Sequence, residues 1–167
     1  QEKLGYDPQS LTPILGTGQL AYCVVVHPSF PARSIEELIQ VLRASPGKYS
    51  YGSPGVGNIA HLAAEKFKKA AGVDMLHVPY KGSGPAMTDL VGGQVLSMSE
   101  TVPAALQFIQ AGQLRALAVT TNKRIGQLPD VPTVTEATGI PNFDVVSMFG
   151  IEAPADTPKF IVKDRKS

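Results

Sequence analysis

Apolar and polar positions recur along the chain in an order typical of strands followed by turns and helices. The longest apolar run, residues 20–26, has the length of a buried strand and is far too short to span a bilayer. Further on, Ser34 and Glu37 have the spacing of a helix capping box, and an apolar stripe at helical spacing follows in Ile35, Leu38, Ile39 and Leu42. These positions predict a helix that begins after Ser34 and ends at the Ser45-Pro46-Gly47 sequence.

The same order repeats downstream. The pattern predicts strands at residues 48–52, 75–79, 95–99 and 114–120, and helices at 59–71, 85–91, 104–111 and 134–138. Glycines stop several of these helices, Gly72 among them. In the helix at 59–71, the side chains expected to point inward are Leu62, Ala63, Phe67 and Ala70. Strands that alternate with helices of this length indicate right-handed βαβ units, so we expect an α/β fold with a mostly parallel sheet flanked by helices.

Both ends of the chain lack the regular alternation of strand and helix patterns that the middle shows. Residues 5–18 are rich in Gly and Pro and are expected to form a loop. Beyond Asn122, prolines interrupt the chain and leave an apolar segment at residues 143–151. Residues 159–167 have the pattern of a helix start, but the sequence ends before the helix could continue, so we expect the chain to be truncated at this end. The start at Gln1 shows no signal-peptide pattern.

Composition limits the kinds of function. The chain has 167 residues, of which 43% are hydrophobic, enough for one domain with a core, and its net charge is only +1. This balance gives no electrostatic case for nucleic acid or for an anionic membrane, so any charge used in function is local. A single cysteine, Cys23, excludes an internal disulfide and a cysteine-based zinc cluster, and its apolar neighbours predict a buried strand thiol.

Polar and glycine-rich turns follow three of the predicted strands, and in a parallel sheet such turns share one edge. The turn at residues 53–58 supplies Ser53, Gly55, Gly57 and Asn58; the turn at 80–84 supplies Tyr80, Lys81, Gly82 and Ser83; the turn at 99–103 supplies Ser99, Glu100 and Thr101. Glycine lets a backbone approach a ligand closely, and the amides that open a helix lack intrahelical partners. Helix starts gathered at one edge favour an anion, with about 0.3–1 kcal/mol from each. The sequence therefore predicts a carboxylate site.

Each of these features also has an ordinary structural interpretation. The two glycines of the first turn can simply make it tight, Lys81 can be solvated, and the Ser and Thr hydroxyls can merely cap helices. Glu100 is at odds with an anion site because a carboxylate repels an anion. It would accept a hydrogen bond from a bridging water or from a ligand hydroxyl or amine, or it would face solvent.

Catalytic motifs are weak in this chain. The three histidines, His27, His61 and His77, form no H-E-x-x-H motif, and no G-x-S-x-G motif occurs. The first turn fits neither a Walker A loop nor a dinucleotide fingerprint. A small α/β enzyme that uses Ser53, His61 and Lys81 remains an alternative, with Ser53 as nucleophile and His61 as base.

Several segments resemble the tripartite tricarboxylate transporter substrate-binding family, the Bug or TctC-type proteins. They are Y-G-S-P-G-V-G at 51–57, V-P-Y-K-G-S at 78–83, D-L-V-G-G-Q-V at 89–95, A-G-Q-L-R-A-L-A-V-T at 111–120, L-P-D-V-P-T at 128–133 and F-G-I-E-A-P at 149–154. The match runs in consistent order from about residue 22 to 157. The second and fifth of these segments are the most specific.

The resemblance implies a non-enzymatic, two-lobed periplasmic binding protein of type II, which captures a small carboxylate for a membrane permease. Residues 1–24 would be a remnant of the first lobe with a crossover strand, 25–142 the second, ligand-binding lobe, and 143–167 the return strand and the start of the first lobe's C-terminal part. The family binds its ligand largely through main-chain amides and waters, without cofactor or metal. The ligand contacts carried over to this chain are Ser53, Gly55, Gly57, Asn58, His61, Tyr80, Lys81, Gly82, Glu100 and Thr101.

The chain also departs from the family pattern. The family's opening segment and C-terminal helical region have no counterpart here, so the chain is expected to be truncated relative to the two-lobed proteins. Where the family usually has Phe-Asp-Asn, this sequence has Ser99-Glu100-Thr101, and Met148 replaces an aromatic residue. These differences put the identity of the ligand in doubt. A carboxylate-sensing domain of a signalling system is a further alternative, and so is self-association of the fragment through its connecting strands.

Overall fold

The structure, a computed structural model, describes Asp7 and residues 10–165. The chain divides into two compact units. The larger unit is Leu20–Ser147, and the smaller unit joins the chain before Leu20 to the chain after Ser147. No helix in the described part of the chain is long and apolar enough to cross a membrane.

Strands and helices alternate through most of the chain. In chain order the elements are β1 (Leu11–Val26), α1 (Ile35–Ala44), β2 (Ser50–Ser53), α2 (Ile59–Ala71), β3 (Leu76–Pro79), α3 (Ser83–Val91), β4 (Ser97–Thr101), α4 (Val102–Gln110), β5 (Arg115–Val119), α5 (Val134–Thr138), β6 (Val146–Pro154) and α6 (Lys159–Arg165). The fold class is α/β, as the sequence predicts.

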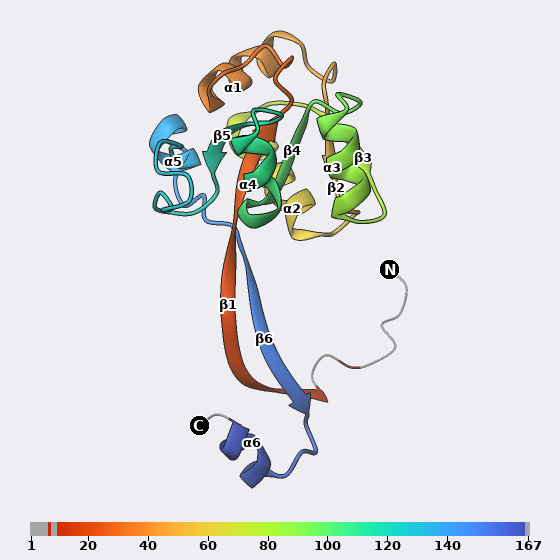
Figure 1. The fold of residues 1–167 in the computed structure, drawn as a ribbon, viewed down its shortest axis with the longest axis vertical. Helices are drawn as coiled ribbons and strands as arrows, with labels where there is room; N and C mark the ends of the chain where they lie inside the picture. Colours follow the sequence, from red (N-terminus) through yellow and green to blue (C-terminus); the bar gives the residue numbers. More distant parts are fainter. Residues whose placement is uncertain (1–6, 8–9, 166–167) are drawn as a thin grey trace. The chain divides into compact units, whose positions relative to one another are not determined.

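The sheet of the larger unit has the order β3-β2-β4-β1-β5, and β6 also pairs with β1 (Figure 1). β2 is parallel to both β3 and β4. β1 is antiparallel to both β4 and β5. It follows that β2, β3, β4 and β5 all point the same way, and that the sheet is mixed because β1 is inserted between two of them in the opposite direction.

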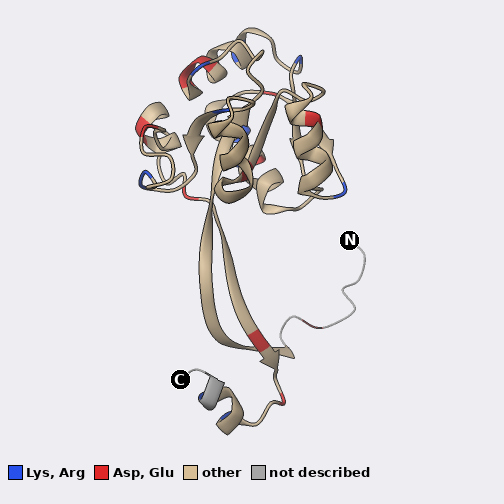
Figure 2. Ribbon diagram, in the orientation of Figure 1, with Lys and Arg blue, Asp and Glu red and all other residues tan. Residues whose placement is uncertain are grey.

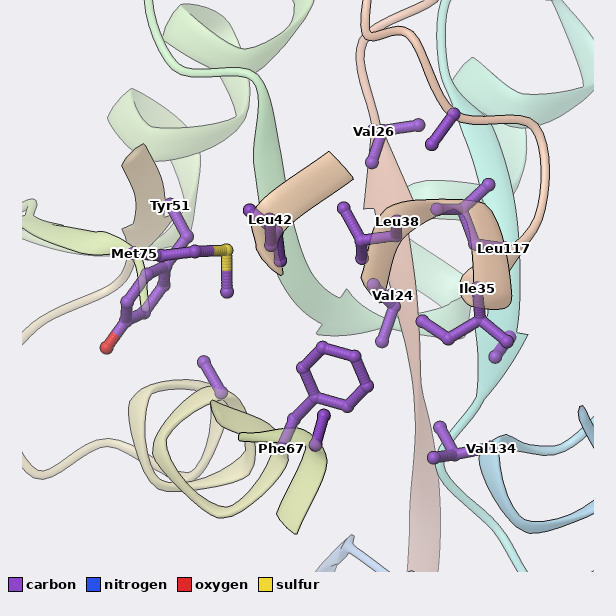
Figure 3. Close-up of a cluster of buried hydrophobic side chains, with 14 of the residues drawn as sticks. Val24, Val26, Ile35, Leu38, Leu42, Tyr51, Phe67, Met75, Leu117 and Val134 are labelled. Carbon is purple, nitrogen blue, oxygen red and sulfur yellow. The ribbon is translucent and has the colours of Figure 1, made fainter. Parts of the chain in front are cut away.

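Both faces of this sheet are covered by helices, as the period-2 alternation of β1 requires. Val24 and Val26 pack with the side chains of α1, α2 and α5, which include Ile35, Leu38, Leu42, Phe67 and Val134 (Figure 3). Cys23 and Val25 pack on the other face, against α3 and α4. The sheet therefore lies between two helical layers, each with its own hydrophobic cluster.

Local start and stop signals fix several elements at their predicted positions. The Asn58 side chain caps α2, which ends at Gly72 in the left-handed conformation with φ +62°. The Ser34 hydroxyl accepts the Glu37 N–H at 3.2 Å, so the predicted N-cap of α1 is confirmed. The predicted capping box is only half formed, because the Glu37 carboxylate accepts the Arg33 N–H at 2.7 Å.

Three expectations from the sequence are wrong. Residues 11–18 belong to β1 rather than to a loop, since their backbone is part of a strand that pairs with β6. Glu100 and Thr101 belong to β4 rather than to a turn, because register with Cys23 and Tyr22 of β1 extends the strand. Leu62 and Ala70 are exposed, since α2 presents its smaller residues Ala60, Ala64 and Ala71 to the core together with Ala63 and Phe67.

The smaller unit contains the start of β1, the end of β6 and α6. The Ala155 N–H donates to the Ser10 carbonyl at 2.7 Å and ties the two chain segments together beyond the strands. The predicted helix start at Lys159 is confirmed by α6, which runs to Arg165.

Candidate ligand-binding site

The ends of three parallel strands define one edge of the larger unit. β2 ends at Ser53, β3 at Pro79 and β4 at Thr101. Ser53 is in register with Pro79, and β2 is parallel to β4 as well. The turns at residues 53–58 and 80–82, which lead into α2 and α3, therefore lie along the same edge as the direct passage from β4 into α4 at Thr101 and Val102.

The first two turns are joined by their backbones. The Tyr80 N–H donates to the Ser53 carbonyl at 2.9 Å, and the Gly82 N–H donates to the Pro54 carbonyl at 3.0 Å. A Cβ on Gly55 would lie 3.4 Å from the Tyr80 carbonyl oxygen, and Gly55 has φ +146°. The distance is an ordinary contact, so it is the backbone conformation of the first turn that favours glycine at this position.

Side chains of α2 organise the first turn further. The Asn58 Oδ1 accepts the Ala60 N–H at 2.9 Å, and the His61 Nδ1 accepts the Gly57 N–H at 3.2 Å. Gly57 has φ +82°, which glycine adopts at low cost. Since the opening amides of a helix have no intrahelical acceptor, the start of α2 leaves partial positive charge at this edge.

The starts of α3 and α4 are held differently. Neither the Gly82 nor the Thr101 N-cap forms a side-chain capping hydrogen bond. Instead, the Ser83 hydroxyl donates to Oε2 of Glu100, and Oε1 of Glu100 accepts the Thr101 N–H at 2.7 Å and the Thr101 hydroxyl at 3.1 Å. The Glu100 side chain is buried, with Glu100 only 3% exposed. A carboxylate of the protein itself therefore lies where α3 and α4 begin.

Ser53 and the histidines form a cluster beneath the first turn. Ser53 is fully buried; its Oγ accepts the Gly55 N–H at 3.2 Å and lies 2.6 Å from the His77 Nε2. His61 and His77 stack with ring centroids 4.2 Å apart. Burial lowers the pKa of His77, and the neighbouring His61 ring lowers it further. Ser53 is thus hydrogen-bonded to His77 rather than to His61, the base that the enzyme alternative requires.

Tyr80 and Lys81 occupy the second turn. The Tyr80 hydroxyl donates to the Asp89 Oδ2 of α3 at 2.8 Å, and burial, followed by this hydrogen bond and the charge of Asp89, raises the Tyr80 pKa. Lys81 is exposed and adds a positive charge beside the turn. Elsewhere on the larger unit, basic and acidic residues are scattered over helices and loops (Figure 2). Lys81 is consequently the cation that the local sequence brings to this turn.

Two residues at this edge were not found from the sequence. Tyr22 is in register with Thr101, and its hydroxyl lies 2.8 Å from the Ser147 Oγ. Both belong to the strands that leave the larger unit. Only the antiparallel register of β1 against β4 brings Tyr22 to the edge, and the local sequence carries no signal for that register.

A metal site is not evident in the part of the chain that the structure describes. It contains no group of three or more His, Cys, Asp or Glu side chains placed to hold a metal ion. The polar groups at the edge are backbone amides, hydroxyls, the Lys81 ammonium and the Glu100 carboxylate. Such a set suits hydrogen bonding to an organic ligand.

Comparison with known proteins supports a family assignment. The model of the tripartite tricarboxylate transporter family receptor, TctC, matches residues 1–167. Protein BugT of Bordetella pertussis is 38% identical over 155 residues, which cover 92% of this chain and 47% of BugT. The chain belongs to the TctC family of solute-binding receptors, which are not enzymes.

Solved structures give the same result. The Rhodopseudomonas palustris protein Rpa4515, solved with adipate, superimposes with a TM-score of 0.90 at 38% identity. MatC from the same organism, with bound malate, gives a TM-score of 0.86 at 29% identity. Both alignments cover 98% of this chain and 55% of the other protein. The chain therefore spans about half the length of the relatives that it matches.

Proposed function

We propose that the edge formed by the ends of β2, β3 and β4 binds a carboxylate group of a small organic solute. The observation that carries this proposal is the parallel register of the three strands, which gathers their turns and the starts of α2, α3 and α4 on one side. Amides at helix starts stabilise an anion without a full counter-charge, and glycine turns allow close approach. The mechanism is non-covalent capture without cofactor.

The relatives support an organic acid as the solute. Rpa4515 was solved with adipate and MatC with malate, both of which are small dicarboxylates. A carboxylate also fits the donors at this edge, which are backbone amides and the Lys81 ammonium. Hydrogen bonds to an ionised oxygen are stronger than hydrogen bonds between neutral groups.

Each predicted residue has a distinct part in this proposal. Gly55, Gly57 and Gly82 shape the turns, and Lys81 supplies positive charge. The hydroxyls of Ser53 and Tyr80 are hydrogen-bonded to His77 and Asp89, so these two residues hold the turns in place rather than contact the ligand through their hydroxyls. The remaining members of the proposed site hold the helix starts, namely Asn58 and His61 at α2, and Glu100 and Thr101 at α4.

The larger unit would serve as the second lobe of a two-lobed periplasmic receptor, with residues 25–142 as its body. The rest of the ligand shell would then come from parts of the receptor outside this unit. Delivery to membrane permease subunits is part of the same proposal, as the description of the matching family model suggests.

Isothermal titration calorimetry of the 167-residue chain with adipate, malate and a diamine of similar length tests the function. We expect saturable binding of the acids at high micromolar to millimolar concentration, and no binding of the diamine. Binding of the diamine alone would contradict a carboxylate site. Submicromolar affinity for an acid would contradict the idea that the ligand shell is incomplete in this chain.

A further inference from the structure

Three helices of the larger unit begin with the same kind of contact, in which the side chain of the third helical residue accepts a backbone N–H from the residues just before the helix. In α1, the Glu37 Oε2 accepts the Arg33 N–H at 2.7 Å, and in α5 the Glu136 carboxylate accepts such an N–H at 3.0 Å. In α2 the acceptor is the His61 Nδ1, which accepts the Gly57 N–H at 3.2 Å. Of these three helices, the one that begins at the proposed site is thus the one whose acceptor is not a carboxylate.

The start of α2 carries no negative charge of its own. The structure describes every residue of α2, and none in its first turn is acidic, whereas α1 and α5 both have acidic residues there. The N-cap is the neutral amide of Asn58, and the His61 ring is neutral in this contact because Nδ1 accepts an N–H only when it carries no proton. The first acidic residue of α2 is Glu65, in the second turn, where Tyr51 and Lys68 donate to it.

This neutrality matters for an anion. The opening amides of a helix have no intrahelical acceptor and carry partial positive charge. A protein carboxylate placed among them would be stabilised by that charge, but it would repel an external carboxylate. An amide oxygen and an imidazole nitrogen accept the same hydrogen bonds without adding charge. Stacking on His77, with ring centroids 4.2 Å apart, holds the His61 ring in place.

We propose that Asn58 and His61 are neutral caps, which position the turn at residues 53–58 and keep the start of α2 available to an external carboxylate. Both are positioning residues, and their lack of negative charge makes the site selective for anions. The inference rests on the proposed function and deepens it, because it assigns the bound carboxylate to the start of α2.

Two substitutions at one position separate charge from capping. His61→Gln and His61→Glu both keep an acceptor and differ by one charge, and Glu37 of α1 shows that glutamate at this position reaches the same kind of N–H. We expect His61→Glu to bind adipate at least about tenfold more weakly than His61→Gln in NMR titrations at neutral pH. Its melting temperature is equal to that of His61→Gln or higher, since an acidic residue stabilises a helix start. The affinity ratio falls toward one in about 1 M sodium chloride, which screens the added charge.

A second variant tests the same charge at the N-cap. Asn58→Asp keeps the size of the side chain and the oxygen that caps α2, and it does not touch the stacked histidines. We expect it to bind adipate at least about tenfold more weakly than wild type, with no loss of melting temperature. Gln40→Glu adds the same charge at an exposed position of α1 and leaves the affinity unchanged.

The outcomes separate this inference from the proposed function. If wild type binds adipate and each acidic variant binds it as tightly as its neutral partner, the inference is overturned and the proposed function stands. An affinity ratio that does not respond to salt also overturns it, because that result shows a change of shape rather than of charge. If wild type does not bind adipate, the proposed function fails and the role of the neutral caps fails with it. If His61→Glu does not fold, Asn58→Asp decides.

Discussion

At the scale of single residues, the edge depends on backbone conformations that only glycine adopts easily. Gly82 has φ +116° and ψ 172°, a region that is almost exclusive to glycine. A Cβ at Gly82 would meet no atom within 4 Å, so any cost of a substitution comes from the backbone rather than from a clash. A substitution at Gly82 therefore measures the backbone strain of the turn before α3 alone.

Gly82→Ala is expected to lower the free energy of unfolding by about 1–3 kcal/mol, because alanine is strained in this conformation. Gly126→Ala is the matched control: Gly126 also has open space for a Cβ, and its φ lies outside the left-handed range. It should change stability by less than about 1 kcal/mol. Urea denaturation measures both. Equal effects of the two substitutions would show that the turn imposes no strain.

The His77 pKa gives stability a pH dependence of definite sign. Because burial lowers the folded-state pKa of His77, the unfolded chain takes up the proton at a higher pH than the folded chain does. Unfolding free energy therefore falls as pH drops below about 6.5, down to the folded-state pKa. His77→Gln should lose less stability than wild type between pH 8 and 5.5. An identical pH dependence in the two proteins, measured by urea denaturation, would rule out this contribution.

At the scale of elements, local signals were predictable and pairings between distant strands were not. The ends of α2 and α5 follow from Asn58, Gly72 and the Thr133 capping box, all of which act within a few residues. The extension of β4 through Glu100 requires register with β1, more than seventy residues earlier in the chain. The bonds of Ser53 to His77 and of Ser83 to Glu100 likewise join elements that are separate in the chain, β2 with β3 and α3 with β4. The sequence could therefore nominate Ser53 and Glu100 without giving their partners.

The central position of β1 predicts an inert thiol. Cys23 is fully buried between β4 and β5, and burial together with the charge of Glu100 raises its pKa to about 12. Since the thiolate is the reactive form, a thiol reagent should not label the native chain over an hour at pH 8, yet should label it completely in denaturant. Cys23 is the only cysteine of the sequence, so the signal is unambiguous. Stoichiometric labelling within minutes in native buffer would contradict the buried placement.

At the scale of the whole molecule, apolar exposure is concentrated in the smaller unit. Among the described residues, six of the nine exposed large hydrophobic side chains belong to it: Leu15, Met148, Phe149, Ile151, Phe160 and Ile161. Exposed apolar surface on this scale favours association.

We therefore expect the 167-residue chain to self-associate at micromolar concentration, with a light-scattering mass that rises with concentration. The double substitution Phe149→Ser and Ile151→Thr should reduce this mass toward that of the monomer. Leu62→Ser, at an exposed apolar position of the larger unit, is the control and should leave association unchanged. A chain that stays monomeric at all concentrations would contradict the expectation.

The most direct test of a carboxylate site at this edge is an NMR titration of the isotope-labelled chain with adipate, because it detects weak binding and locates it. We expect saturable shifts in the amides of residues 55–59 and 81–84, all with one common affinity, and we expect Lys81→Gln to weaken that affinity severalfold. Shifts that are confined to α1 or α5, or that do not saturate, would contradict a carboxylate site at this edge of the sheet.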